Sequence, residues 1–155
     1  MEREKGLEGL QVWQRALAFA GFIAREVLPL LPEDKKWALT NQLRRSAQSI
    51  PANIAEGYGR YYYQEGVRFC YLARGSLEET FSHLALAKEL DYISTEIFEH
   101  TLSDIKELRR MLSGYIAYLK RSKRGANEPG QNLEAHDLKV PYLSDLDMNF
   151  PDDQS

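Results

Sequence analysis

The sequence has few of the residues that build disulfides, metal centres and membrane spans. It contains one cysteine in 155 residues, which excludes an internal disulfide and a pair of thiolate ligands for a metal. Its longest apolar run, residues 16–24, is far shorter than the roughly 20 residues that cross a bilayer. The charged start, residues 1–6, is not typical of a signal peptide. We therefore expect a cytoplasmic protein that does not enter a membrane.

Catalytic patterns are also scarce. The chain contains no Gly-x-Ser-x-Gly element and no glycine-rich phosphate loop. Glu79 with His83 and Glu96 with His100 are each four residues apart, whereas a di-iron bundle uses two Glu-x-x-His pairs. Cys70 lies in an apolar helical pattern, so we expect a small buried side chain. The prediction is a protein that is not an enzyme, with no catalytic residue, cofactor, metal or small-molecule substrate, and a metal-dependent enzyme is the minor alternative.

Apolar residues recur at spacings of three and four, which is typical of buried helix faces. No stretch alternates with the period of two that marks a half-buried strand. The predicted class is all-α, an up-down antiparallel four-helix bundle in residues 1–125, with Ser94 or Thr95 capping the last helix. The predicted helical segments cover about residues 7–31, 37–57, 64–90 and 95–124.

The first segment carries two neighbouring apolar stripes. Its inward stripe is predicted to contain Leu10, Trp13, Leu17, Ala20, Ala24, Val27 and Leu31. A second stripe beside it contains Val12, Ala16, Phe19 and Ile23. Together they are wider than the core of one bundle requires. The excess predicts burial against another subunit.

Two places in the middle helices contain unusual residues. Pro51 removes a backbone donor and frees the carbonyl of Ala47, but apolar spacing continues on both sides, so we expect a kink and not a break. Asn53 and Glu56 are predicted to satisfy polar groups around that kink, and Gly57–Gly59 to permit the following turn. In the third segment, the small residues at 75 and 76 predict a close helix crossing.

The character of the chain changes after residue 125. Residues 106–124 carry seven basic residues and one acidic residue, whereas residues 126–155 carry seven acidic residues and one lysine. Cations are favoured near a helix C-terminus in any protein. The acidic, proline-containing segment 126–155 is predicted to be a flexible tail or to dock on a partner.

One stretch resembles a known bacterial family. Residues 42–60, QLRRSAQSIPANIAEGYGR, are similar to the signature of the 23S rRNA-intervening-sequence proteins, also called S23-type four-helix bundle proteins. Residues 68–69, 73–79 and 86–87 are similar to the third helix of that family, and the resemblance covers about residues 7–119. It implies an up-down bundle that assembles into a homopentameric ring or barrel.

The resemblance also implies a more distant similarity to the accessory variability determinant proteins of diversity-generating retroelements. Those bundles partner a reverse transcriptase and bind nucleic acid. The family has no established enzymatic activity. The acidic tail departs from the short basic ending of the family, and it could screen a basic fourth helix.

Two sets of residues are candidates for contact with nucleic acid. Arginine offers forked donors to phosphate, and tyrosine offers a face on which unpaired bases stack. The first set, predicted around the turn between the second and third helices, is Arg44, Arg45, Arg60, Tyr61, Tyr62, Tyr63, Arg68 and Arg74. The second set, at the basic end of the fourth helix, is Lys120, Arg121, Lys123 and Arg124. In the structural alternative, the tyrosines pack a subunit interface and the arginines pair with Glu56, Glu65, Glu78 and Glu79.

These patterns favour a homo-oligomeric accessory or scaffold protein that binds RNA or DNA. One alternative is an accessory variability protein that binds a reverse transcriptase and its RNA template. Another is a protein-only assembly module whose acidic tail recognises the partner.

Overall fold

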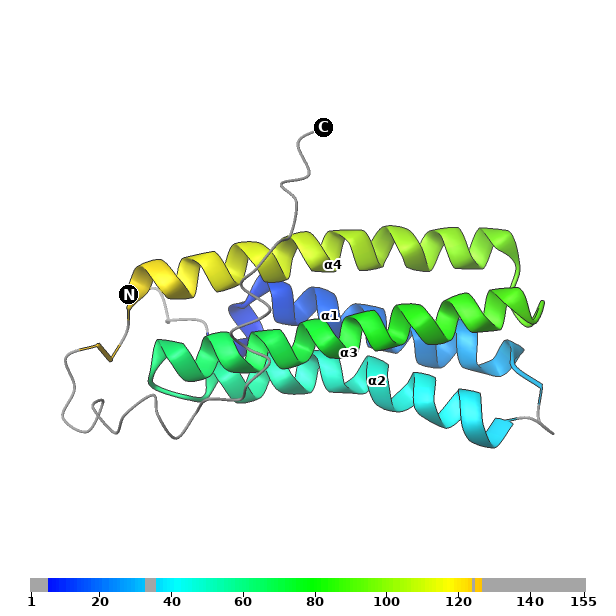
Figure 1. The fold of residues 1–155 in the computed structure, drawn as a ribbon, viewed down its shortest axis with the longest axis horizontal. Coiled ribbons are helices and arrows are strands. Elements are labelled where there is room, and N and C mark those ends of the chain that lie inside the picture. The colour runs from blue at the N-terminus through cyan, green and yellow to red at the C-terminus, as the bar shows by residue number, and fades with distance from the viewer. Residues whose placement is uncertain (1–5, 33–35, 124, 127–155) are drawn as a thin grey trace. The chain divides into compact units, whose positions relative to one another are not determined.

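Four long helices and no strand make up the described part of the chain. The computed structural model describes residues 6–32, 36–123 and 125–126. The predicted all-α class is confirmed over these residues (Figure 1). The chain divides into two units, residues 1–124 and residues 125–155, and residues 127–155 of the predicted tail lie outside the described residues. The helices are α1 (Gln11–Phe22), α2 (Lys36–Tyr58), α3 (Tyr63–Glu89) and α4 (Thr95–Ser122).

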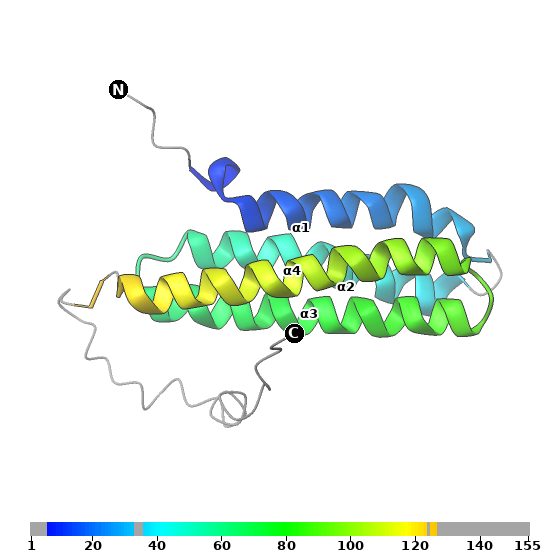
Figure 2. The ribbon, with the colours of Figure 1, turned by 90° about the horizontal axis from the view of Figure 1, so that it is seen from above.

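The helices form a bundle in which α1 lies beside α2 and α4, diagonally from α3 (Figures 1 and 2). Short turns join α2 to α3 and α3 to α4, so neighbouring helices run antiparallel. The turn between α2 and α3 therefore lies at the same end of the bundle as the C-terminal end of α4 (Figure 1). None of the helices that the structure describes is long and apolar enough to cross a membrane.

The N-terminal segment is not the single regular helix that the spacing predicts. A 3₁₀ turn, Leu7–Gly9, precedes α1, and a π-helical turn (Ile23–Val27) and a second 3₁₀ turn (Leu28–Leu30) follow it. A π turn contains more residues than an α turn, so it rotates the residues after it relative to the face before it. One apolar stripe therefore cannot stay buried along the whole segment.

The face of α1 that packs into the core is the second of the two predicted stripes, and not the one predicted to point inward. Val12, Ala16, Phe19 and Ile23 are buried, whereas Leu17 of the predicted inward stripe is 50% exposed. Leu10, Trp13 and Ala20 of that stripe are only partly buried, Ala24 is exposed, and Val27 and Leu31, which follow the start of the π turn, are buried. The assignment of the two stripes was wrong before the π turn and correct after it.

Hydroxyl groups join α2 to α3 inside the bundle. The Thr80 hydroxyl donates to Ser46 Oγ at 2.9 Å, and both side chains are buried. Closer to the α2–α3 turn, the hydroxyl oxygens of Ser49 and Ser76 lie 2.5 Å apart. Because these polar groups bond one another, their burial carries no unsatisfied-donor cost. Apolar residues of α2 spaced three and four apart are buried around them, with residues 43, 47, 50 and 54 at 0–1% exposure.

Helix α3 approaches α2 closely at Gly57 and at Ser76, but not at Gly75. A Cβ on Gly57 would lie 2.8 Å from the Cβ of Phe69 and 3.2 Å from the carbonyl oxygen of Gly66. Gly57 is thus needed for the approach of α3 and lies within α2, before the turn. Gly75 is exposed, and a Cβ there would meet nothing within 4 Å. Its predicted role in a crossing was wrong.

Helix α2 continues through Pro51, as predicted. The side-chain amide of Asn53 donates to the carbonyl oxygen of Ser49 at 2.9 Å and to Ser49 Oγ at 3.1 Å. Asn53 therefore binds Ser49, which lies two residues after Ala47, and not the Ala47 carbonyl that the proline frees. Glu56 is exposed and pairs with a residue of the following turn, so its predicted role at the kink was wrong.

Candidate nucleic-acid interface

The structure does not bring the first predicted set of residues together. Arg44 and Arg45 are exposed on α2, and 13 residues of α-helix place Arg45 roughly 20 Å from the end of that helix at Tyr58. Neither arginine pairs with another described residue. Arg74 is directed towards α4, where its Nη2 donates to Ser113 Oγ at 2.6 Å. The predicted position of these three arginines around the α2–α3 turn was wrong, and their binding of phosphate stays a prediction.

Arg60 and Arg68 do lie at the turn, and both are held in place. Arg60 pairs with Glu56 at 2.7 Å and Arg68 with Glu65 at 3.4 Å. Their guanidinium carbons lie 5.5 Å and 5.3 Å from the centroid of the Phe69 ring, within the range of cation–π attraction. The predicted alternative pairing with these two glutamates is therefore present, and it fixes the orientation of both guanidinium groups.

The other two glutamates of that alternative have different partners. Glu78 binds Arg109 of α4 through two hydrogen bonds of 2.5 Å and 2.8 Å, and the hydrogen bonding raises the pKa of this arginine. Glu79 lies 3.3 Å from His83 on the same helix. The first contact ties α3 to α4, and the second lies within α3.

The basic end of α4 lies at the same end of the bundle as the α2–α3 turn. Lys120 Nζ donates to the hydroxyl of Tyr71 on α3 at 3.2 Å. Arg121 and Lys123 are exposed and pair with no other described residue. Lys123 has a left-handed backbone, with φ of 46°, and its N–H binds the Leu119 carbonyl at the end of α4. Arg124 lies outside the described residues.

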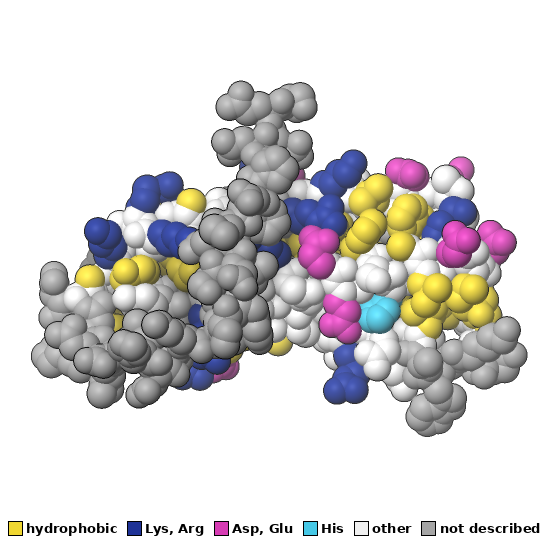
Figure 3. All heavy atoms as spheres, in the orientation of Figure 1, with side chains coloured by type: hydrophobic (Ala, Val, Ile, Leu, Met, Phe, Trp, Pro, Cys, Tyr) yellow, Lys and Arg dark blue, Asp and Glu magenta, His cyan; other side chains and the backbone are white. Residues whose placement is uncertain are grey.

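Basic side chains consequently gather where α4 ends. Figure 3 shows Lys and Arg side chains over that part of the molecule. We name this end, formed by residues 57–68 and 115–123, the tyrosine end. The two predicted sets, far apart in the sequence, thus contribute Arg60, Arg68, Lys120, Arg121 and Lys123 to one end of the bundle.

Tyrosines surround a cavity at the tyrosine end. Its volume is about 270 Å³. The rings of Tyr61 and Tyr62 meet edge to face at 5.6 Å, and those of Tyr115 and Tyr118 stack at 6.2 Å with 16° between their planes. We name this cavity the tyrosine cavity. The tyrosines that line it are Tyr58, Tyr61, Tyr62, Tyr63, Tyr115 and Tyr118.

Sequence reasoning missed three of these tyrosines. Tyr58 lies within the predicted Gly57–Gly59 turn, and neither Tyr115 nor Tyr118 was a candidate for contact with nucleic acid. The available signal was topological, because an antiparallel bundle places the end of its fourth helix beside the start of its third. Tyr118, three residues after Tyr115, then falls next to the tyrosine triplet at 61–63.

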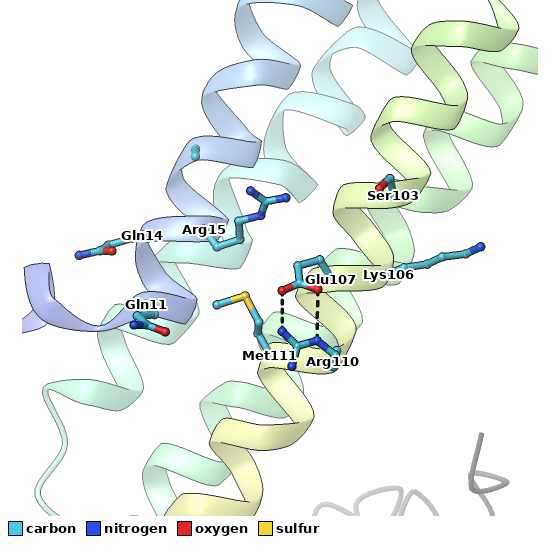
Figure 4. Close-up of a pocket in the computed structure, with 9 residues that line it drawn as sticks. Gln11, Gln14, Arg15, Ser103, Lys106, Glu107, Arg110 and Met111 are labelled. Atoms are coloured by element: carbon cyan, nitrogen blue, oxygen red, sulfur yellow. Dashed lines mark hydrogen bonds and ion pairs between the residues drawn. The ribbon is translucent and has the colours of Figure 1, made fainter. Parts of the chain in front are cut away.

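A larger, open groove of about 790 Å³ lies between α1 and α4. Figure 4 shows Arg110 bound to Glu107 by two hydrogen bonds, while the side chain of Lys106 extends away from the groove. The hydrogen bonding from Arg110 lowers the pKa of the Glu107 carboxyl. Arg15 pairs with Asp104 at 2.7 Å. Because cations and carboxylates are paired here, the groove presents no surface of one charge.

Cys70 is not available for chemistry at the surface. Its side chain is buried below the tyrosine end, and burial raises the pKa of the thiol to about 12. Within the described residues, no group of three His, Cys, Asp or Glu side chains is placed to hold a metal ion. The arrangement at the tyrosine end is therefore one of cations, ring faces and phenol hydroxyls, which can bind a ligand through phosphate and aromatic contacts.

Comparison with known proteins relates the chain to one family. The family model described as 23S rRNA-intervening sequence protein matches residues 8–114. A crystal structure of a protein from Bacteroides thetaiotaomicron, described as of unknown function and from the S23 ribosomal protein family, is 28% identical with a TM-score of 0.63. That similarity covers 68% of this chain and 97% of the other. No curated protein matches the chain. The basic end of α4, with Tyr115 and Tyr118, follows the last residue matched by the family model.

Proposed function

The chain belongs to the 23S rRNA-intervening sequence protein family, and from that premise we propose that it is a cytoplasmic, non-enzymatic accessory protein that binds nucleic acid as a homo-oligomer. One observation carries the proposal. Cations and tyrosines from the α2–α3 turn and from the end of α4 meet at the tyrosine end, around the tyrosine cavity. Phosphate attracts the cations, and ring faces stack on bases.

The cations of the tyrosine end differ in how they would contribute. Arg60 and Arg68 are oriented by glutamates and by Phe69, so they offer fixed donors with part of their charge neutralised. Arg121 and Lys123 are exposed and unpaired within the described residues. These two side chains supply most of the uncompensated positive charge, which is the main source of affinity for a phosphate backbone.

Exposed leucines support the homo-oligomer. Leu17 on α1 is 50% exposed, and Leu72 and Leu86 on α3 are 42% and 46% exposed. Contact between copies would remove this apolar surface from water. A closed ring, pentameric as the family resemblance implies, would repeat the tyrosine end around its axis and strengthen the local potential. Light scattering should report a multiple of the 17.9 kDa chain mass and a smaller species for Leu72→Glu/Leu86→Glu.

The test is fluorescence anisotropy with a stem-loop RNA and a DNA duplex across a salt series. Each phosphate contact contributes about 0.7–0.9 to the slope of log affinity against log salt. Arg121→Glu/Lys123→Glu should weaken binding and lower that slope by roughly 1.5. The matched control is Arg44→Glu/Arg45→Glu, which makes the same change of charge on two exposed arginines in the middle of α2.

Two results would contradict the proposal. If binding is weak for both nucleic acids at low salt, a protein partner such as a reverse transcriptase becomes the better hypothesis. If Arg44→Glu/Arg45→Glu lowers the affinity and the salt slope as much as Arg121→Glu/Lys123→Glu does, the binding surface does not lie at the tyrosine end.

A further inference from the structure

The tyrosine cavity has features that phosphate binding leaves unexplained. Attraction of phosphates needs cations on an open surface, whereas this cavity is formed mainly by aromatic rings from two separate segments. We propose that the tyrosine cavity receives one unpaired nucleobase, so that the protein selects single-stranded or looped nucleic acid over a continuous duplex. This inference rests on the proposed function and adds the class of nucleic acid to it.

The size of the cavity fits one planar ring system. Its volume of about 270 Å³ lies just below the range of roughly 300–1,000 Å³ for pockets that hold drug-sized ligands. A single base therefore fits, and a stack of several bases does not. Gly66 lines the cavity, and a Cβ there would lie 3.2 Å from Leu119 Cδ1. The glycine thus lets Leu119 of α4 pack closely against α3 in the wall of the cavity.

The tyrosine rings are held in a way that favours stacking. Tyr118 stacks on Tyr115 with nearly parallel planes and is still 57% exposed. Its outer face can extend the stack by one base, because offset-stacked aromatic pairs are favoured over isolated rings. Tyr58 is also a lining residue and is 38% exposed. The phenol hydroxyls supply donors and acceptors for the edge of a base.

Cations beside the cavity would bind the phosphates of the same nucleotide chain. Arg60 is itself a lining residue, and Ser122, between Arg121 and Lys123, is another. A strand whose base enters the cavity therefore runs past these charges. A base within a duplex would first have to leave its partner and its stack. The cost of that step is the physical source of the selection.

The experiment compares strands that carry the same phosphates but differ in their bases. Anisotropy is measured with labelled single strands of one mixed sequence, made as RNA and as DNA, with an abasic DNA strand of equal length, and with the blunt duplex. The single strands should bind at least about tenfold more tightly than the abasic strand and the duplex. Equal affinities for the RNA strand and the DNA strand would show that the protein does not distinguish the sugar. A higher affinity for either strand would still support the base as the ligand of the cavity.

Tyrosine variants connect the preference to the cavity. Tyr118→Leu should abolish the preference for the single strand over the abasic strand, whereas Tyr118→Phe, which keeps the ring, should retain it. Tyr92→Leu, which changes a partly buried tyrosine in the α3–α4 turn at the opposite end of the bundle, is the control and should retain it too. Because Tyr118 is largely exposed, its variants should melt at the temperature of the wild type.

The outcomes separate this inference from the proposed function. Salt-dependent binding of all strands with equal affinity would overturn the base-binding cavity and leave nucleic-acid binding in place. A preference for bases that survives in Tyr58→Leu/Tyr118→Leu would also overturn it. Absence of binding to every strand at low salt would overturn the proposed function and the cavity together.

Discussion

The two ends of the bundle are built differently. At the closed end, which we define as residues 86–97 around the α3–α4 turn, Ile93 is 4% exposed and belongs to the main hydrophobic core. Asp91 takes a left-handed backbone, with φ of 58°, and the Ser94 hydroxyl accepts the Ile97 N–H as the helix cap. At this end Ile93 therefore completes the core and Ser94 caps α4, while Leu86 and Leu90 remain 46% exposed.

The tyrosine end uses its residues in the opposite way. Its turn exposes Tyr61 by 48%, and the hydrophobic residues beneath form a small cluster around Val67, Cys70 and Ile116, separate from the main core. Apolar ring surface left open in a folded protein is a common property of binding sites. The two ends therefore differ in how much aromatic surface they leave open, and the tyrosine end is the one that we propose as the recognition surface.

The largest expected effect is at the closed end. Ile93→Ala removes a buried side chain of the main core, which should lower the free energy of unfolding by about 2–4 kcal/mol. Urea unfolding followed by circular dichroism measures this change. Nucleic-acid affinity, measured where the variant is still folded, should stay that of the wild type. A loss of affinity in the folded variant would break the separation of the two ends.

The next effect concerns the helix crossing beneath the tyrosines. Gly57→Ala places a Cβ 2.8 Å from the Cβ of Phe69, so we expect a loss of about 1–3 kcal/mol of stability and weaker binding. Gly75→Ala is the matched control on an open helix face, where better helix propensity should raise stability by about 0.5–1 kcal/mol. The melting temperatures of both variants measure these changes in stability. Equal shifts of the melting temperature in the two variants would rule out a close crossing at Gly57.

Two buried threonines offer a smaller, matched test. Thr80→Val removes the hydroxyl that binds Ser46 Oγ and the Ser76 carbonyl, and we expect a loss of about 1–2 kcal/mol. The buried hydroxyl of Thr40 has no hydrogen-bond partner among the residues that the structure describes, so Thr40→Val should be neutral or stabilise by up to about 1 kcal/mol. Urea unfolding of the two variants should therefore give opposite signs, and a destabilised Thr40→Val would show that its hydroxyl is satisfied.

The smallest expected effect is a pH dependence of stability that comes from Cys70, in the hydrophobic cluster beneath the tyrosine end. Burial raises the pKa of Cys70 from 9.0 to about 12, so between these values the unfolded chain loses the thiol proton and the folded protein retains it. Stability should then fall as the pH rises above 9, by about 1 kcal/mol at pH 10. This fall in stability should be absent from Cys70→Ala. The free energies of unfolding of the variant and of the wild type are compared from pH 8 to pH 10. Identical pH profiles would indicate that the thiol is already open to water.

The fold was more predictable than the arrangement of its surface. The inward positions of α2, such as Leu43 and Ile50, follow the regular helical spacing from which the helices were predicted, and the structure buries them. The α1 stripe was misassigned because the π turn at residues 23–27 changes the rotation of the chain, and no local composition marks such a turn. Gly57 was assigned to a turn because its true constraint, the approach of Phe69, comes from another helix.

The sequence by itself determined the helical segments and the family, and it supplied the arginine, lysine and tyrosine side chains of the candidate interface. These properties depend on residues close together in the chain, because helix periodicity and short motifs are local. Only the tertiary structure decided which of those residues meet. It separated Arg44, Arg45 and Arg74 from the turn and brought Tyr115, Tyr118 and the end of α4 to it. Antiparallel packing sets such distances, because it joins chain segments that sequence spacing keeps far apart.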